Sequence, residues 1–124
     1  MTKNILVMDD EELIIKSLIK LLGKTGYQVL VAKNGQEALA IVEEESIDLI
    51  VADIRMPGLN GVETICALYK QAEQKNTAKI PVIFITGYAD DQIRQKAKTL
   101  KPVAYIYKPF DIQDLVKKIE EVLG

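Results

Sequence analysis

Several side chains that could bind a metal ion or a phosphate group stand at the ends of short apolar segments of this 124-residue sequence. Asp9 and Asp10 follow one segment, Asp53 ends a second, and Thr86 and Lys108 follow two more. Carboxylates brought together repel one another and raise one another's pKa values unless a cation lies between them. Oxygen ligands suit a hard cation, and Mg²⁺ is the cation that we expect. A lysine ammonium and a threonine hydroxyl suit phosphoryl oxygens. The set therefore predicts a Mg²⁺-dependent phosphate site, provided that the fold brings these segments together.

Each of these residues also has an ordinary structural interpretation. Asp10 could be the N-cap of a helix that begins with acidic residues. Asp53 could begin the turn that leads to Gly58, and Lys108 could be a solvated charge in a turn. Thr86 could simply be a β-branched residue at a strand end. The N-cap interpretation of Asp10 explains nothing about Asp53, and for all four ordinary interpretations to hold at once would require a coincidence.

Two kinds of segment alternate along the chain. Short apolar segments rich in β-branched residues predict strands at 5–8, 29–32, 49–52, 82–85 and 103–107. Apolar residues spaced by three and four predict helices at 13–22, 36–45, 62–73, 90–99 and 112–123. The order is a strand followed by a helix, repeated five times.

Strands that are apolar on both faces must be covered on both faces, and right-handed crossovers then give a parallel sheet between two helical layers. The five-stranded member of this α/β class is the flavodoxin-like three-layer sandwich with strand order 2-1-3-4-5. The segment 27–30, Tyr-Gln-Val-Leu, alternates more than the other predicted strands, as an edge strand does. In such sheets ligands bind beyond the carboxyl ends of the strands, where strands 1 and 3 diverge.

Length and composition limit the other functions of the chain. We expect one domain over 1–124. One cysteine and no histidine indicate a reducing, cytoplasmic compartment and exclude a Cys/His zinc site and Ser–His or Cys–His catalysis. Cys66 lies on the apolar face of a predicted helix and is expected to pack in the core. A net charge of −2 without a basic stripe argues against direct nucleic-acid binding, and the apolar segments are too short to cross a membrane.

Four motifs of the sequence resemble a known family, the receiver domain of two-component response regulators. They stand in the order and spacing of that family and span the chain: Met8–Glu11, Val51–Gly58 with Asn60–Gly61, Ile85–Tyr88, and Tyr107–Phe110.

The resemblance implies a role for each polar residue. Asp53 would accept a phosphoryl group from a phosphohistidine of a histidine kinase or phosphotransfer protein, or from a small acyl phosphate. Because this chain has no histidine, the donor must be another molecule. Asp10 and Asp53 would ligate Mg²⁺ together with the backbone carbonyl of Arg55, while Asp9 would act through water and hydrogen bonds. Lys108 would neutralise the phosphoryl oxygens.

The resemblance also implies a switch. The Thr86 hydroxyl would turn toward the phosphoryl group and the Tyr105 ring would rotate inward, which changes the face formed by the fourth helix, fifth strand and fifth helix. That face would recruit a downstream output domain or protein, and a dimer that forms on phosphorylation is compatible with it. The fourth helix has the thinnest apolar stripe and is expected to move most easily. The domain would be no enzyme beyond its own phosphorylation and dephosphorylation, and Lys108–Pro109 would be a cis bond.

Two residues bear on the lifetime of the phosphorylated state. Arg55 and Tyr88 stand two residues after Asp53 and Thr86, at positions that in receiver domains flank the path of the hydrolytic water. Neither is a good base at neutral pH, so we expect them to cover the phosphoryl group and slow its hydrolysis.

Three other functions are alternatives to a phospho-acceptor. Gly23–Thr25 reads GKT, but a P-loop needs glycine where Leu18 stands. A Mg²⁺-dependent phosphatase with an aspartyl nucleophile, similar to the haloacid dehalogenases, would show D-x-D-x-T where this chain has Asp9–Glu12. A receiver-like interaction module that is never phosphorylated is the third alternative.

Overall fold

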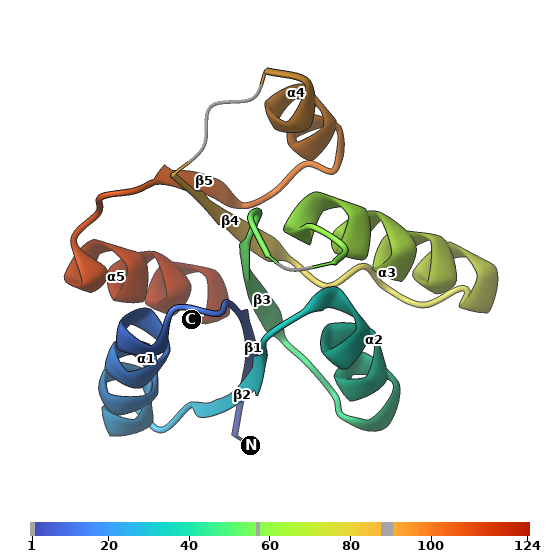
Figure 1. Ribbon diagram of the computed structural model, residues 1–124. Coiled ribbons are helices and arrows are strands. Elements are labelled where there is room, and N and C mark those ends of the chain that lie inside the picture. Colours follow the sequence, from blue (N-terminus) through green and yellow to red (C-terminus); the bar gives the residue numbers. More distant parts are fainter. Residues whose placement is uncertain (1, 57, 88–90) are drawn as a thin grey trace.

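The computed structural model describes residues 2–56, 58–87 and 91–124. Strands and helices alternate along these residues (Figure 1): β1 (Asn4–Met8), α1 (Glu12–Lys24), β2 (Gln28–Ala32), α2 (Gly35–Glu44), β3 (Leu49–Asp53), α3 (Gly61–Lys75), β4 (Val82–Thr86), α4 (Asp91–Thr99), β5 (Ala104–Tyr107) and α5 (Ile112–Leu123).

The strands form one parallel sheet in the order β2-β1-β3-β4-β5, which confirms the order predicted from the sequence. Helices α1 and α5 lie together on one face, and α2 and α3 lie on the other (Figure 1). The β2 strand lies at one edge, as predicted from a pattern that alternates more than those of the other strands. The molecule is therefore the three-layer sandwich that the apolar segments indicate.

Both faces of the sheet are buried, because alternate residues of each central strand face opposite helical layers. In β3, Leu49 and Val51 pack in the core next to α1 and α5. Ile50 and Ala52 pack in the second core, to which α2, α3 and α4 contribute. Cys66 is half-buried and packs against this second core, as predicted. Among the described residues of α4, Ala97 alone is fully buried, so this helix is held to the sheet by little apolar contact.

The ends of the elements differ from the predictions by one or two residues. The fifth strand starts at Ala104, because Val103 is 40% exposed and lies before the ladder with β4. Helix α3 continues to Lys75 and ends at Asn76, whose φ of 56° is left-handed. Helix α1 begins at Glu12 with Glu11 at the N-cap position, so the alternative role of Asp10 as N-cap is wrong.

A glycine brings the start of α3 close to the end of β3. A Cβ atom at Gly61 would overlap the backbone oxygen of Asp53 and lie 3.0 Å from the Cα atom of Ile54. Asn60 and Glu63 form a capping box at this helix start, with the Asn60 side chain accepting a hydrogen bond from the Glu63 amide at 2.8 Å. These contacts fix the backbone next to Asp53.

No helix among the described residues has the length and apolar character needed to cross a bilayer.

Candidate functional site

Three carboxylates converge at the carboxyl ends of β1 and β3, which are neighbours in the sheet. Met8 pairs with Ala52, so Asp9 and Asp53 follow matched positions on the two strands. Asp9 and Asp53 are 1% and 2% exposed, whereas Asp10 is exposed. Asp9, Asp10 and Asp53 each offer an oxygen, and these atoms lie within 4.8 Å of one another. The structure thus brings together the three acids that the sequence singled out.

Asp9 is a buried acid with one unused oxygen. Its Oδ1 atom accepts a hydrogen bond from the Glu11 backbone amide at 2.9 Å. Its Oδ2 atom is buried and has no hydrogen-bond partner among the described residues. Burial raises the pKa of the Asp9 carboxyl to about 6, and the nearby Asp53 carboxylate contributes to the increase. The hydrogen bond from the Glu11 amide opposes this increase in pKa, and the expected repulsion between carboxylates is present but smaller than the effect of burial.

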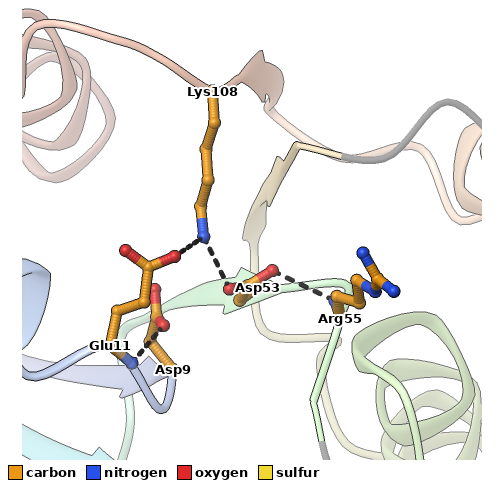
Figure 2. A network of polar contacts seen from close by, with 5 residues as sticks. All are labelled: Asp9, Glu11, Asp53, Arg55 and Lys108. Atoms are coloured by element: carbon orange, nitrogen blue, oxygen red, sulfur yellow. Dashed lines mark hydrogen bonds and ion pairs between the residues drawn. The ribbon is translucent and has the colours of Figure 1, made fainter.

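Asp53 has a fixed orientation because both of its oxygens accept hydrogen bonds. Oδ1 accepts from the Arg55 backbone amide at 3.0 Å, and Oδ2 accepts from the Lys108 ammonium at 2.9 Å (Figure 2). The first contact is the local turn that the ordinary interpretation of Asp53 predicted. The second contact comes from Lys108, which is distant in the sequence, so Asp53 forms a local turn and belongs to the polar site as well.

Lys108 reaches the acids from the turn between β5 and α5. Its backbone amide donates to the Thr86 carbonyl at 2.8 Å, and its peptide bond to Pro109 is cis, as predicted. Its ammonium forms ion pairs with both Asp53 and Glu11 (Figure 2). Burial lowers the pKa of Lys108, but hydrogen bonds to Glu11 and Asp53 outweigh it, so the pKa is raised above its usual value.

Glu11 is a residue of the site that the sequence patterns did not indicate. Its carboxylate contacts Lys108 although 97 residues separate the two in the chain. The available signal was its position, immediately after the two aspartates at the end of an apolar strand. Glu11 and Lys108 help to line an open pocket of about 500 Å³, and its other lining residues are Asp10, Asp53, Arg55, Met56 and Gly87.

The two residues expected to act as a switch contact each other. Thr86 is fully buried at the end of β4 and hydrogen-bonds the Tyr105 side chain. The Tyr105 ring lies between the rings of Phe84 and Tyr107, with centroid distances of 6.3 and 5.2 Å. Burial is the main cause that raises the pKa of the Tyr105 phenol. The guanidinium of Arg94 on α4 donates to the Tyr107 hydroxyl at 3.3 Å, which links α4 to β5.

The residues expected to control the phosphoryl lifetime are only partly described. The Arg55 side chain is exposed, and in Figure 2 its guanidinium extends away from the Asp53 carboxylate. Tyr88 lies outside the described residues. The covering role of these two side chains therefore stays a prediction.

The chain matches a family model, described as the response regulator receiver domain, over residues 5–120. This protein belongs to the response regulator receiver domain family. It is thus a receiver domain of two-component systems, in agreement with the resemblance seen in its motifs.

Individual relatives agree with this assignment. The chain is 38% identical to Protein PilH of Pseudomonas aeruginosa over 120 residues, which cover 97% of each protein. It is 33% identical to Sporulation initiation phosphotransferase F of Bacillus subtilis over 99% of this chain and 95% of that protein. The crystal structure of a CheY-like response regulator receiver domain protein from Methanospirillum hungatei JF-1 superposes with a TM-score of 0.85 and 32% identity, covering 99% of this chain and 94% of that one. Other relatives, among them a transcriptional regulatory protein, are longer, and this chain spans about half of their length.

Proposed function

We propose that this receiver domain is a phospho-acceptor of a two-component phosphorelay and that Asp53 accepts the phosphoryl group. The observation that carries the proposal is the state of the Asp53 side chain. It is a buried carboxylate that borders an open pocket, is held by the ammonium of Lys108 and is flanked by two further acids. This arrangement supplies a nucleophile, a positive charge for phosphoryl oxygens and oxygen ligands for a cation.

The acidic cluster fits Mg²⁺. The buried Oδ2 atom of Asp9 lacks a partner among the described residues, and a carboxylate oxygen in that state favours a nearby cation. Asp10, Asp53 and the backbone carbonyl of Arg55 would hold the ion, with Asp9 acting through water and hydrogen bonds. When bound, Mg²⁺ supplies positive charge that stabilises phosphoryl oxygens during transfer.

The chain's own residues position the transfer. One carboxylate oxygen of Asp53 attacks the phosphorus of a donor phosphohistidine, an O–P bond forms, and the P–N bond breaks with its electron pair going to the donor imidazole. Asp53 needs no base, because its carboxylate reacts in the ionised form. The Lys108 ammonium, which lies 2.9 Å from Oδ2, compensates the charge of the phosphoryl oxygens. A histidine kinase, a phosphotransfer protein or a small acyl phosphate would supply the group, since this chain has no histidine.

The signal would leave through the Thr86–Tyr105 contact. A phosphoryl group on Asp53 would draw the Thr86 hydroxyl away from the Tyr105 phenol, which it contacts in this structure. The Tyr105 ring would then move inward and change the face formed by α4, β5 and α5. We propose that this face binds the downstream output domain or protein, and that the domain has no activity beyond its own phosphorylation and dephosphorylation. The single, half-buried Cys66 supports a reducing, cytoplasmic compartment for these steps.

Intact-mass measurement tests the proposal directly. The protein is incubated with acetyl phosphate and Mg²⁺, and we expect the mass gain of one phosphoryl group. Asp53→Asn should abolish the gain. Asp114→Asn, the same substitution at an exposed position on α5, should leave it unchanged. No gain in the wild type would favour the interaction module that is never phosphorylated, and a full gain in Asp53→Asn would show that another residue is the acceptor.

A further inference from the structure

Lys108 has two carboxylate partners in this structure. The side chain of Asp53 is 3% exposed, whereas that of Glu11 is 52% exposed, and both residues line the pocket. The side chain of Lys108 between them is 21% exposed. The ammonium is therefore already neutralised by two carboxylates before any phosphoryl group enters.

The two partners differ in what happens on phosphorylation. Asp53 would be joined to the phosphoryl group, so its contact with Lys108 can pass to the new oxygens. Glu11 is a separate carboxylate on the loop before α1. It would have to share the Lys108 ammonium with the phosphoryl oxygens or lose its contact with the ammonium. An ammonium has three N–H donors, so every contact that it keeps with Glu11 is one that a phosphoryl oxygen cannot use.

The side chain of Glu11 has no other role in the described structure that would explain its position. Glu11 occupies the N-cap position of α1, but its side chain makes no capping hydrogen bond. The adjacent residue, Glu12, forms its ion pair with Lys33 at 2.6 Å, at the end of β2. Two neighbouring glutamates of the same charge thus have different partners, and only Glu11 contacts the lysine of the site.

We propose that Glu11 competes with the phosphoryl group for Lys108, so that an incoming phosphoryl group must either share the ammonium with the Glu11 carboxylate or displace it. This inference rests on the proposed phospho-acceptor function. Glu11 is then a positioning residue that acts through Lys108 and sets how tightly the pocket holds a phosphoryl-like anion.

Fluoroberyllate, an analogue of the phosphoryl group, measures this competition without turnover. With Mg²⁺ at saturation, Glu11→Gln should bind fluoroberyllate about two- to fivefold more tightly than the wild type, the range expected for a partly exposed ion pair. The initial rate of phosphorylation at low acetyl phosphate should rise by a similar factor. Glu12→Gln removes the same charge one residue away and should change neither quantity.

A double-mutant cycle separates competition from a general repulsion of anions. If Glu11 acts through Lys108, Glu11→Gln should not alter the phosphorylation rate in a Lys108→Gln background. A rate increase that persists without Lys108 would overturn the proposal, and so would a Glu11→Gln protein with wild-type affinity for fluoroberyllate. If the wild type accepts neither phosphoryl group nor fluoroberyllate, both this inference and the proposed function fail. A phosphorylatable wild type with an inert Glu11→Gln substitution would reject the inference alone.

Discussion

Replacing Asp9 by Asn should stabilise the metal-free protein near neutral pH. Asp9 is 1% exposed, and its pKa lies at about 6, compared with an ordinary value of 3.8. Each pKa unit corresponds to about 1.36 kcal/mol between the two protonation states, so the ionised carboxylate destabilises the fold by roughly 3 kcal/mol. An asparagine of nearly the same shape keeps an oxygen for the Glu11 amide and removes the charge.

The pH dependence follows from the sign of this change. The folded protein binds the Asp9 proton more tightly than the unfolded chain does. This tighter proton binding contributes to the free energy of unfolding of the wild type below pH 4. The contribution is lost as the pH rises through about 6. The advantage of Asp9→Asn should be complete above pH 7, fall to roughly half at pH 5, and become small at pH 4.

Urea unfolding in the presence of a chelator, at pH 7.5 and pH 5, measures both quantities. Glu44→Gln, which removes an exposed carboxylate at the end of α2, should change the free energy of unfolding by less than about 0.5 kcal/mol at either pH. Added Mg²⁺ should stabilise the wild type more than Asp9→Asn, because a ligand stabilises the state that binds it. A variant less stable than the wild type at pH 7.5 without metal, or one whose advantage grows on acidification, would refute the reasoning.

Four further predictions concern the packing, the metal and the signal. Gly61→Ala should destabilise the protein by about 1–3 kcal/mol in urea unfolding because its Cβ atom would overlap the backbone at the end of β3, whereas Gly23→Ala, with no atom within 4 Å, should not destabilise it. Calorimetric titration should show that Asp10→Asn weakens Mg²⁺ binding more than Asp9→Asn does, and the opposite ranking would contradict the assigned ligand roles. Fluoroberyllate should change amide exchange in α4, β5 and α5, and changes confined to α2 and α3 would reject the proposed signalling face. Replacing Arg55 by Asn together with Tyr88 by Glu should speed loss of the phosphoryl group, and each tenfold increase in rate corresponds to a hydrolysis barrier lower by about 1.4 kcal/mol. An unchanged time course of phosphate release would show that these two side chains do not cover the phosphoryl group.

Much of the fold could be predicted because burial on both faces of the sheet leaves a simple pattern in the sequence. Strand β3, for example, needs apolar residues at both Leu49 and Ile50, since each enters a different core. Parallel strands also place their carboxyl ends at one edge, so the meeting of Asp9 with Asp53 follows from the strand order alone. The element ends were less certain because they depend on local contacts such as those around Gly61.

The contacts within the site could not be predicted in the same way. Asp9 and Asp10 are adjacent and chemically identical, yet one is buried and the other exposed. That difference depends on the direction of the chain as it leaves β1, which periodicity does not describe. The contact between Glu11 and Lys108 depends on which rotamer a long side chain adopts across the pocket, and charge complementarity alone would allow Lys108 several acidic partners.

The distribution of stability over the molecule explains how a change at Asp53 could reach a partner. The sheet and its two cores hold the acids close together, although burial makes the ionised form of Asp9 unfavourable. Helix α4, by contrast, has only Ala97 fully buried among its described residues, and an exposed hydrogen bond of 3.3 Å joins its Arg94 to Tyr107. Elements with little buried apolar area open at low free-energy cost. A phosphoryl group that alters the Thr86–Tyr105 contact would therefore displace α4 before it disturbs the central strands, because α4 has fewer fully buried residues than α3 or α5.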